Sequence, residues 1–388
     1  MRALVLSGGG SKGAYQIGVW KALKKLHITF DIVTGTSTGA INGALITQKS
    51  YFKAIKVWKT LNYQSIFGKD FNNETKLEAL YRMFVKNYFT KGGTEVKELQ
   101  TLINKNLKLR KFYKSNINYG LITYNVSTKN AVSMEKKDIP KEKLGDYILA
   151  SASCFPAFKK KEIDGEEYVD GGYYDNMPVN LAIDMGADEV IAVDLKAVGL
   201  KRKTKKPIKE TIISPRNDLS NFLVFDPNIS KKIMKYGYND TMKTYGSLEG
   251  NKFTFKRKQL KKFNDRYIEK YKKLLLKVLN TNELMNIFTK NLLNSKFTKK
   301  IEKYALEKLI EDIGYKYKLD DTKIYTFHSF NRKLKRKVKK NLKTDHKDIT
   351  LHMYKLLLKR NYTQIRKDAI LKPLDLARAI YIYIVLEG

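Results

Sequence analysis

Residues 1–18 read MRALVLSGGGSKGAYQIG and decide the fold. Residues 3–6 are an uninterrupted apolar run, which is typical of a strand buried on both faces of a parallel sheet. Glycines follow at once, and from Ala14 to Leu26 apolar residues recur at helical spacing with lysines between them. A second predicted strand at 30–33 completes the order strand, loop, helix and strand. This opening predicts an α/β fold with a mainly parallel sheet.

The glycine loop from Gly8 to Gly13 matches the dinucleotide fingerprint G-x-G-x-x-G. Such a loop serves any anion that must approach backbone N–H groups at a helix N-terminus, so the match alone does not identify the ligand. A dinucleotide fold also needs an acidic residue at the end of the second strand. Asp31 lies at its start instead. A dinucleotide-binding oxidoreductase therefore stays an alternative, but the acidic residue that it needs at the end of the second strand is missing.

A serine follows the second strand directly, in the stretch Gly35-Thr-Ser37-Thr-Gly39. The match to G-x-S-x-G lies between a strand and a helix of small residues at 40–45, which is the context of a nucleophile elbow. Such a turn exposes the serine hydroxyl at a helix N-terminus, and the flanking glycines avoid collisions with neighbouring backbone. The alternative interpretation is a Ser/Thr-rich helix cap.

A nucleophilic serine needs a base, and no histidine has suitable surroundings. One lies at the end of the first helix, where it suits the helix dipole, and three lie in the basic C-terminal region: His27, His328, His346 and His352. A carboxylate is better placed. Asp170 ends a predicted hairpin at 161–170, and Gly171 and Gly172 follow it. Alone, the tripeptide reads as an ordinary Asp-Gly turn.

Taken in order, the three motifs resemble the patatin-like phospholipase family, over about residues 1–245. The family's pattern is a G-G-G-x-[K/R]-G loop, a G-x-S-x-G elbow and a D-G-[G/A] tripeptide, and residues 150–156 (ASASCFP) are similar to its A-S-x-x-x-P segment. The resemblance implies a three-layer α/β/α catalytic domain without metal or cofactor. It also implies a serine acyl hydrolase that cleaves phospholipid esters through an acyl-enzyme, with lysophospholipase or thioesterase as alternatives on the same residues.

The resemblance assigns roles residue by residue. Ser37 would be the nucleophile and Asp170 the general base, with no third member. The backbone N–H groups of the first loop would form the oxyanion hole, and a basic residue of that loop would lie near the lipid phosphate. The implied residues are Gly8, Gly9 and Gly10 for the oxyanion, Lys12 for the phosphate, and Gly13, Gly35, Gly39, Gly171 and Gly172 as loop and elbow glycines.

The chain changes character near residue 248, so we predict a catalytic domain at 1–248 and a basic, mainly helical region at 249–388. The net charge is +37, and residues 246–388 hold 36 Lys and Arg against 15 Asp and Glu. This excess suits an anionic membrane surface, a solvated helical face, or drift in an A/T-rich genome. A nucleic-acid-binding protein is a rival supported by charge alone, because no nucleic-acid motif accompanies it.

Two further expectations concern location and the single cysteine. The N-terminus does not resemble a secretory signal, and the longest uncharged run, 32–48, is too polar for a membrane span, which predicts a cytoplasmic or peripheral membrane protein. Cys154 excludes an intramolecular disulfide and is expected to fill the core. The sequence carries no signal for oligomeric state.

Overall fold

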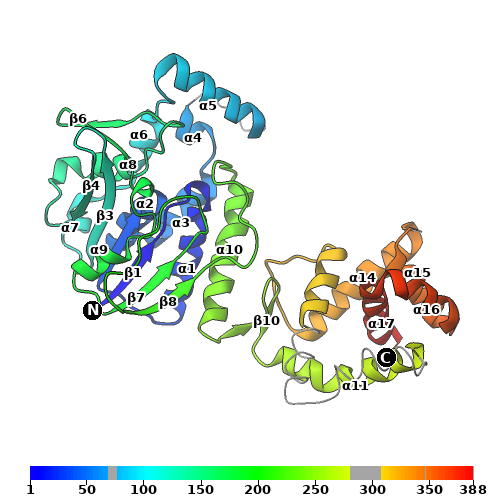
Figure 1. The fold of residues 1–388 in the computed structure, drawn as a ribbon. Coiled ribbons are helices and arrows are strands. Elements are labelled where there is room, and N and C mark those ends of the chain that lie inside the picture. Colours follow the sequence, from blue (N-terminus) through cyan, green and yellow to red (C-terminus); the bar gives the residue numbers. More distant parts are fainter. Residues whose placement is uncertain (69–76, 280–306, 346, 388) are drawn as a thin grey trace. The chain divides into compact units, whose positions relative to one another are not determined.

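The computed structural model describes residues 1–68, 77–279, 307–345 and 347–387, and it divides into two compact units. Unit 1 is Met1–Thr244 and unit 2 is Tyr245–Gly388 (Figure 1). The division lies four residues before the boundary predicted from the sequence. Its physical reason is that strand β9 (Leu248–Glu249) pairs with β10 (Thr254–Lys256) inside unit 2.

Unit 1 is built on an eight-stranded sheet in the order β5-β6-β3-β2-β1-β7-β8, with β4 also paired to β3. Neighbours from β3 to β8 along this order run parallel, whereas β4 and β6 are antiparallel to β3. The mainly parallel sheet confirms the predicted α/β class. The strands are β1 (Arg2–Leu6), β2 (Ile32–Thr36), β3 (Asn118–Asn125), β4 (Asn130–Glu135), β5 (Lys161–Ile163), β6 (Glu166–Asp170), β7 (Glu189–Val193) and β8 (Lys209–Ile213).

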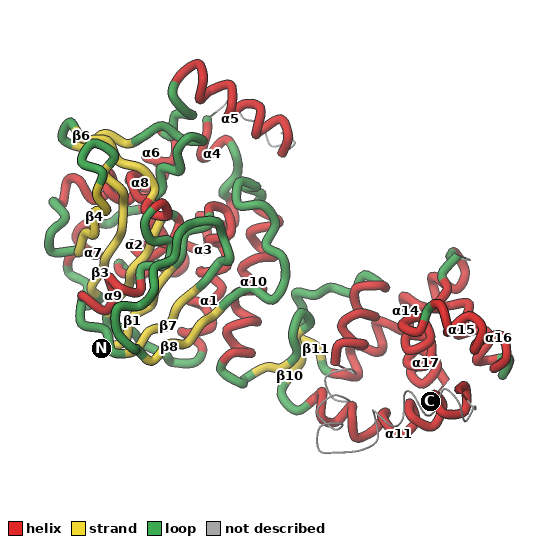
Figure 2. Tube along the Cα trace, viewed as in Figure 1, coloured by secondary structure: helices red, strands yellow, loops and turns green. Residues whose placement is uncertain are grey.

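Helices surround this sheet (Figure 2). The α-helices of unit 1 are α1 (Ala14–Lys25), α2 (Thr38–Thr47), α3 (Tyr51–Thr60), α4 (Gln64–Phe67), α5 (Leu77–Lys91), α6 (Lys97–Asn106), α7 (Leu109–Tyr113), α8 (Leu144–Ser151), α9 (Val179–Asp184) and α10 (Pro227–Thr244). Short 3₁₀ helices are η1 (Gly10–Gly13), η2 (Lys141–Lys143) and η3 (Gly171–Tyr173).

The three layers follow from side-chain alternation along the buried strands. Ile32 of β2 belongs to a core cluster with Val179 and Ile183, which are both residues of α9. The next residue, Val33, faces α2, where its Cγ1 atom lies 3.2 Å from the position that a Cβ on Gly43 would take. Helix α9 therefore covers one face of the sheet and α2 the other.

The predicted hairpin at 161–170 is present as β5 and β6. Asp164 and Gly165 form its turn with φ values of 55° and 80°. Both angles are in the left-handed region that a two-residue hairpin turn of this kind requires, and Asp-Gly is among the dipeptides that adopt it most readily. The turn thus fixes the register that carries Asp170 to the end of β6.

Unit 2 is mainly helical, with a three-stranded sheet in the order β11-β10-β9. Its apolar core joins all the helices named below and includes Phe253, Phe330 and Tyr325. The remaining elements are β11 (Ile324–Tyr325), α11 (Gln259–Leu279), α14 (Phe327–Thr344), α15 (Ile349–Leu358), α16 (Tyr362–Leu371) and α17 (Pro373–Glu387), and residues 307–316 are also helical.

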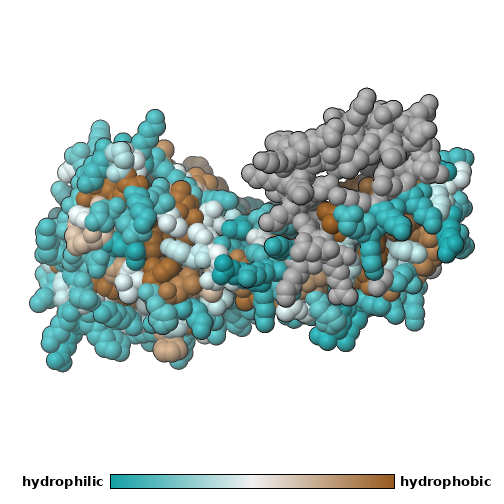
Figure 3. All heavy atoms as spheres, turned by 90° about the horizontal axis from the view of Figure 1, so that it is seen from below, coloured by the Kyte–Doolittle hydropathy of each residue, from teal (hydrophilic) through white to brown (hydrophobic). Residues whose placement is uncertain are grey.

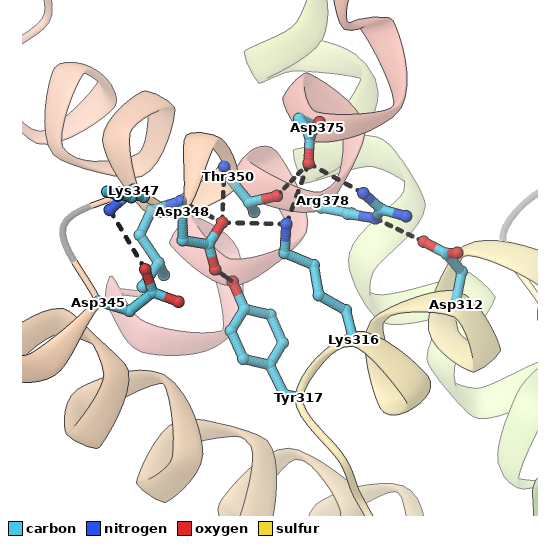
Figure 4. Close-up of polar contacts among 10 residues, drawn as sticks. Asp312, Lys316, Tyr317, Asp345, Lys347, Asp348, Thr350, Asp375 and Arg378 are labelled. Atoms are coloured by element: carbon cyan, nitrogen blue, oxygen red, sulfur yellow. Dashed lines mark hydrogen bonds and ion pairs between the residues drawn. The ribbon is translucent and has the colours of Figure 1, made fainter.

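A polar network joins three helices of unit 2, as Figure 4 shows. The Lys316 ammonium lies 2.9 Å from Asp348 and 3.2 Å from Asp375. Arg378 contacts Asp375 at 2.9 Å and Asp312 at 2.5 Å. The cations therefore join the N-termini of α15 and α17 to the helix at 307–316. Each carboxylate in this network has a cationic partner.

Hydrophilic side chains cover much of the face shown in Figure 3, with apolar patches between them. Within the part of the chain that the structure describes, no helix is both long enough and apolar enough to cross a membrane.

Candidate active site

The backbone of Ser37 is strained, as a nucleophile elbow requires. Its φ and ψ are 57° and −125°, a region that a residue with a Cβ rarely adopts. The two flanking glycines make the turn possible. A Cβ on Gly35 would lie 2.3 Å from the carbonyl oxygen of Gly39, and one on Gly39 would lie 2.1 Å from that of Leu6. The strand and helix can thus approach closely enough to expose the serine.

The register of β3 brings Asp170 to Ser37. The last residue of β2, Thr36, pairs with Ile122, and the next residue of β3, Thr123, pairs with Asp170 at the end of β6. The ends of β2 and β6 therefore meet along one edge of β3. The Ser37 side chain lies close enough to the Asp170 carboxylate to lower its pKa. The fold thus brings together two residues that are 133 positions apart in the chain.

Burial raises the pKa of Asp170 to about 6, although hydrogen bonds from Ser37 and from the Gly172 N–H act in the opposite direction. The Gly172 N–H donates to Oδ1 at 2.8 Å. Among the described residues, no Lys, Arg or His forms an ion pair with this carboxylate. A carboxylate of raised pKa is a stronger base than an exposed aspartate.

The glycine loop offers two unoccupied backbone donors. The Gly8 N–H donates to the backbone carbonyl of Asn176 at 3.0 Å, and the Ser11 N–H donates to that of Phe222 at 2.8 Å. Within the described parts of the chain, the N–H groups of Gly9 and Gly10 have no acceptor. Of the three glycines expected to bind an oxyanion, Gly8 is therefore already engaged, and Gly9 and Gly10 remain available.

Gly8 nevertheless has a clear reason to lack a side chain. A Cβ there would lie 2.3 Å from Oδ1 of Asn176 and 3.0 Å from Cβ of Ser37. The loop thus packs directly against the serine. Asn176 was not found from the sequence, although it follows the Asp-Gly-Gly motif closely and is almost completely buried. It joins the glycine loop to the segment after Asp170.

Buried amides fix the base of the loop. The Asn42 side chain donates to the Gly13 carbonyl at 3.0 Å and to Oε1 of Gln16 at 2.8 Å, and it accepts from the Trp58 indole at 2.8 Å. Gln16 donates to the carbonyl of Ser7 at 2.7 Å. These bonds lock α1, α2 and α3 to the loop. The sequence holds no motif that marks them.

Ser151 is a second residue missed as a functional candidate, although it lies in the quoted segment 150–156. Its hydroxyl accepts the Ser37 N–H at 2.9 Å and donates to the carbonyl of Ile122 at 2.7 Å. The side chain therefore bridges the elbow to β3. It holds the strained backbone of the serine in place without touching the Ser37 hydroxyl.

An apolar cavity of about 600 Å³ opens at Ser37 and Asp170. Its lining includes Gly9 and Gly10, and most of the other side chains are aliphatic or aromatic. Helices α3, α4 and α6 supply much of the wall: Val57, Trp58, Ile66, Leu99, Leu102 and Ile103. The cavity can take a long apolar group with one end at the serine.

The remaining residues considered in the sequence analysis take different places. Lys12 is half-buried and does not line the cavity. His27 is exposed after α1, His328 and His352 belong to unit 2, and His346 lies outside the described residues. Cys154 lines the cavity and is only partly buried, so the expectation that it fills the core was wrong. Burial, with a smaller effect of Asp170, raises the pKa of its thiol to about 12, which disfavours the nucleophilic thiolate.

Comparison with known proteins agrees with this geometry. The family described as Patatin-like phospholipase matches residues 4–183. Residues 4–183 therefore form a patatin-like phospholipase domain. Two curated relatives match over half of this chain: patatin-like phospholipase domain-containing protein 7 of Rattus norvegicus, 30% identical over 197 residues, and lysophospholipase nte1 of Aspergillus terreus (strain NIH 2624 / FGSC A1156), 28% identical over 196 residues.

The similarity is confined to part of each protein. The matched region spans 13% of the rat relative and 12% of the fungal one. A comparison over 99% of this chain and 90% of the crystal structure of VipD from Legionella pneumophila has a TM-score of 0.36 at 14% identity, too low to support any argument. The domain assignment therefore rests on the family match and on the geometry of unit 1.

Proposed function

We propose that the protein is a serine acyl hydrolase that cleaves fatty-acyl esters of phospholipids. The observation that carries the proposal is that Ser37, in its strained turn, and the buried carboxylate of Asp170 line the same apolar cavity. The family match supports the same chemistry. Ser37 acts as the nucleophile and Asp170 as the general base.

The first half of the reaction makes an acyl-enzyme. As Ser37 Oγ attacks the ester carbonyl carbon, its proton moves to the Asp170 carboxylate, and the carbonyl oxygen becomes an oxyanion. The N–H groups of Gly9 and Gly10 stabilise this charge, and each such donor contributes on the order of 3 kcal/mol. The tetrahedral intermediate collapses when the C–O bond to the alcohol breaks. The alcohol oxygen takes the proton from Asp170, and the lysophospholipid leaves.

The second half releases the fatty acid. Asp170 accepts a proton from water as the water oxygen attacks the acyl carbon, and the same two glycines hold the second oxyanion. Collapse breaks the bond to Ser37 Oγ, which recovers its proton from Asp170. The carboxylate thus acts as a base in each attack and as an acid in each collapse, a role that suits a pKa of about 6.

The cavity supports a lipid substrate over a small polar ester. Its walls around Val57, Leu99 and Ile103 are apolar, so they would bind an acyl chain by removing its surface from water. Lysophospholipids are a second substrate class, favoured by the name of the fungal relative. A thioester would use the same residues. Phosphate binding by Lys12 is not part of the proposal, because this residue does not line the cavity.

The proposal includes reversible attachment to a membrane surface, with the protein otherwise cytoplasmic. Unit 2 supports it through the basic stretch 332–340 (RKLKRKVKK) in α14. Only Leu334 and Val338 are buried in this stretch, whereas most of its cationic side chains are at least partly exposed. Each Lys or Arg near an anionic bilayer contributes about 1 kcal/mol to binding.

The test is release of fatty acid from mixed phospholipid vesicles, followed by mass spectrometry, and from a soluble nitrophenyl ester. We expect Ser37→Ala to reduce both activities to background, because the variant lacks the hydroxyl that attacks the ester. If the wild type is active and the Ser37→Ala variant keeps the same activity, the proposal is refuted. Products from phospholipid, lysophospholipid and acyl thioester in parallel reactions rank the three substrate classes.

Asp175→Asn is the matched control. Burial also raises the pKa of Asp175 to about 6, but its carboxylate accepts backbone N–H groups of Met177 and Arg202 and does not contact Ser37. We expect this variant to keep most of the soluble-ester activity. The control separates contact with the serine from burial of a carboxyl group as such.

A further inference from the structure

Helix α5 carries large apolar side chains on its exposed face. Phe89 is 80% exposed and Val85 56% exposed, and Tyr88 is also exposed. They lie within one helical stripe, because positions three and four apart share a face. Exposed apolar side chains that gather on one face mark interaction surfaces more often than scattered single ones do.

The side of α5 next to this stripe packs beside the cavity. Phe84 is buried, and its ring lies 6.2 Å from that of Phe158, which lines the cavity. The Tyr81 hydroxyl accepts a hydrogen bond from Asn221 at 3.2 Å. Helix α5 is therefore held to its neighbours through Phe84 and Tyr81, while Val85 and Phe89 stay exposed.

A second exposed apolar segment follows β7. Val198 is 93% exposed and Leu200 60% exposed, and both line the cavity. Every residue from Val198 to Pro207 is exposed. A loop of this kind is usually polar. Here it presents two aliphatic side chains at the opening that leads to Ser37.

A chain of contacts joins the two segments around the cavity. The Tyr88 ring lies 5.7 Å from the Phe155 ring, and the carbonyl of Phe155 accepts a hydrogen bond from the Tyr173 hydroxyl. Tyr173 is 47% exposed and lines the cavity. The Leu200 N–H donates to the carbonyl of Gly172 at 3.0 Å. We call Val85, Tyr88, Phe89, Tyr173, Val198 and Leu200 the apolar rim.

Cationic side chains accompany the apolar rim. Residues 196–209 contain seven Lys and Arg and no Asp or Glu. Lys201 and Lys205 pair with Asp194 and Asp184, whereas Lys203 and Lys206 form no ion pair with any described residue. On α5, Arg82, Lys86 and Lys91 are exposed beside the stripe. The side chains of this surface that form no ion pair with a described residue are therefore mainly cationic.

We propose that the apolar rim docks onto an anionic phospholipid bilayer. Apolar side chains would enter the boundary between headgroups and acyl chains, while the neighbouring lysines and arginines contact the headgroups. Tyr173, Val198 and Leu200 of the rim line the cavity, so docking would place a lipid ester at the mouth of the site without full transfer of the lipid through water. This inference rests on the proposed function for its purpose, but the docking itself does not require hydrolysis.

Vesicle flotation with the full chain tests the docking, on phosphatidylcholine vesicles with and without phosphatidylglycerol. Phe89→Asp and the double variant Lys203→Glu/Lys206→Glu should each weaken binding to the anionic vesicles by about tenfold or more. Neither alters a residue that lines the cavity. Their hydrolysis of a soluble nitrophenyl ester should therefore equal that of wild type, while hydrolysis of vesicle lipid falls through a higher KM.

Two variants serve as matched controls. Phe52 on α3 is 83% exposed, as Phe89 is on α5, but it lies near the start of its helix and does not line the cavity. Lys111 and Lys114 are exposed and precede β3, at the end of the sheet opposite Ser37. Phe52→Asp and Lys111→Glu/Lys114→Glu should bind vesicles as wild type does.

The outcomes separate docking from catalysis. Equal vesicle binding by rim variants and wild type overturns the docking surface, even if the protein hydrolyses lipid. Equal losses in rim and control variants also overturn it, because binding would then depend on total charge alone. If Phe89→Asp instead abolishes self-association seen by sedimentation and leaves vesicle binding intact, the stripe contacts a second copy. Absence of soluble-ester hydrolysis in wild type refutes the proposed function and leaves the binding result unaffected.

Discussion

Two buried or nearly buried aspartates, one in each unit, have opposite environments. Asp170 in unit 1 has a hydroxyl, that of Ser37, as its side-chain partner, and burial raises its pKa to about 6. Asp375 in unit 2 is also partly desolvated, but hydrogen bonds from Thr350 and Arg378 outweigh that effect, and its pKa is lowered. Among the described residues, the carboxylate of Asp170 has no cationic partner, whereas that of Asp375 is paired with Lys316 and Arg378.

The contrast shows what each site is built for. Charged groups that only hold a structure together are paired, because an unpaired buried charge is costly. A carboxylate that must accept and return a proton cannot have a tight cationic partner, since the cation would lower its basicity. An uncompensated carboxyl group in a cavity, next to a strained serine, is therefore evidence for chemistry. A carboxylate of similar burial that is paired with cations is instead evidence for a structural role.

The largest expected effect is loss of activity in Asp170→Asn. The amide cannot accept the serine proton, so hydrolysis of the soluble ester should fall by about 10⁴-fold. Folding should not suffer. The raised pKa means that Asp170 favours the folded state below its unfolded pKa and that this stability is lost as pH rises through about 6. Above that pH the variant should unfold at an equal or higher denaturant concentration than wild type.

Asp375→Asn provides the opposite case. Its lowered pKa contributes stability above the unfolded pKa that is lost as pH falls through the folded one. This variant should therefore keep its soluble-ester activity and lose stability at neutral pH. If both substitutions had the same effect on activity and stability, the contrast between the two carboxyl groups would have no functional meaning.

A smaller effect, about 3 kcal/mol of unfolding free energy, is expected for Arg378→Ala. The substitution removes the guanidinium that lies between Asp312 and Asp375 and leaves their carboxylates without that partner. Denaturant unfolding monitored by circular dichroism measures it, and Lys270→Ala, an exposed position on α11, is the control. A loss no larger than that of the control would show that the network of Figure 4 contributes little to stability.

The pH profile should show a tenfold effect. Because the general base must be ionised and its pKa is about 6, kcat/KM for the soluble ester should be constant above about pH 7 and fall about tenfold by pH 5. Asp175→Asn should show the same profile, since the pKa that matters is that of Asp170. A profile that stays flat down to about pH 5 would exclude Asp170 as the titrating base.

The sequence was sufficient for the parts of the site that depend on local backbone. Gly35 and Gly39 predict the elbow because a Cβ at either position would collide with backbone, and Asp164-Gly165 predicts the hairpin that carries Asp170. These requirements involve a few consecutive residues and leave a readable pattern. The parallel sheet followed from the apolar run at 3–6 for the same reason.

Contacts between distant segments leave no such pattern. Asn176 is buried against Gly8, and Asn42 joins the loop to Trp58, yet each is a single asparagine in an ordinary stretch of sequence. The cavity likewise depends on side chains from α3, α4 and α6, which no motif in the sequence marks. The lone Cys154 was expected in the core because its neighbours are apolar, but Cys154 itself lines a cavity. An apolar stretch of sequence is expected both in the core and in the lining of an apolar cavity, so the sequence does not distinguish the two.

The smallest effect is expected for Ser151→Ala. In unit 2, ion pairs hold the helices in place, and this variant tests whether neutral hydrogen bonds do the same for the site in unit 1. Ser151→Ala leaves the Ser37 N–H without its acceptor, so the strained turn loses one restraint, and kcat should fall about fivefold with KM nearly constant. Ser153 is the matched control, because it is equally buried and its hydroxyl donates within the same segment, to Leu149 at 2.8 Å. Both alanine variants should lose similar stability, so stability alone cannot distinguish them. Equal kcat values in the two would mean that the glycines and the strand register hold Ser37 without help from Ser151.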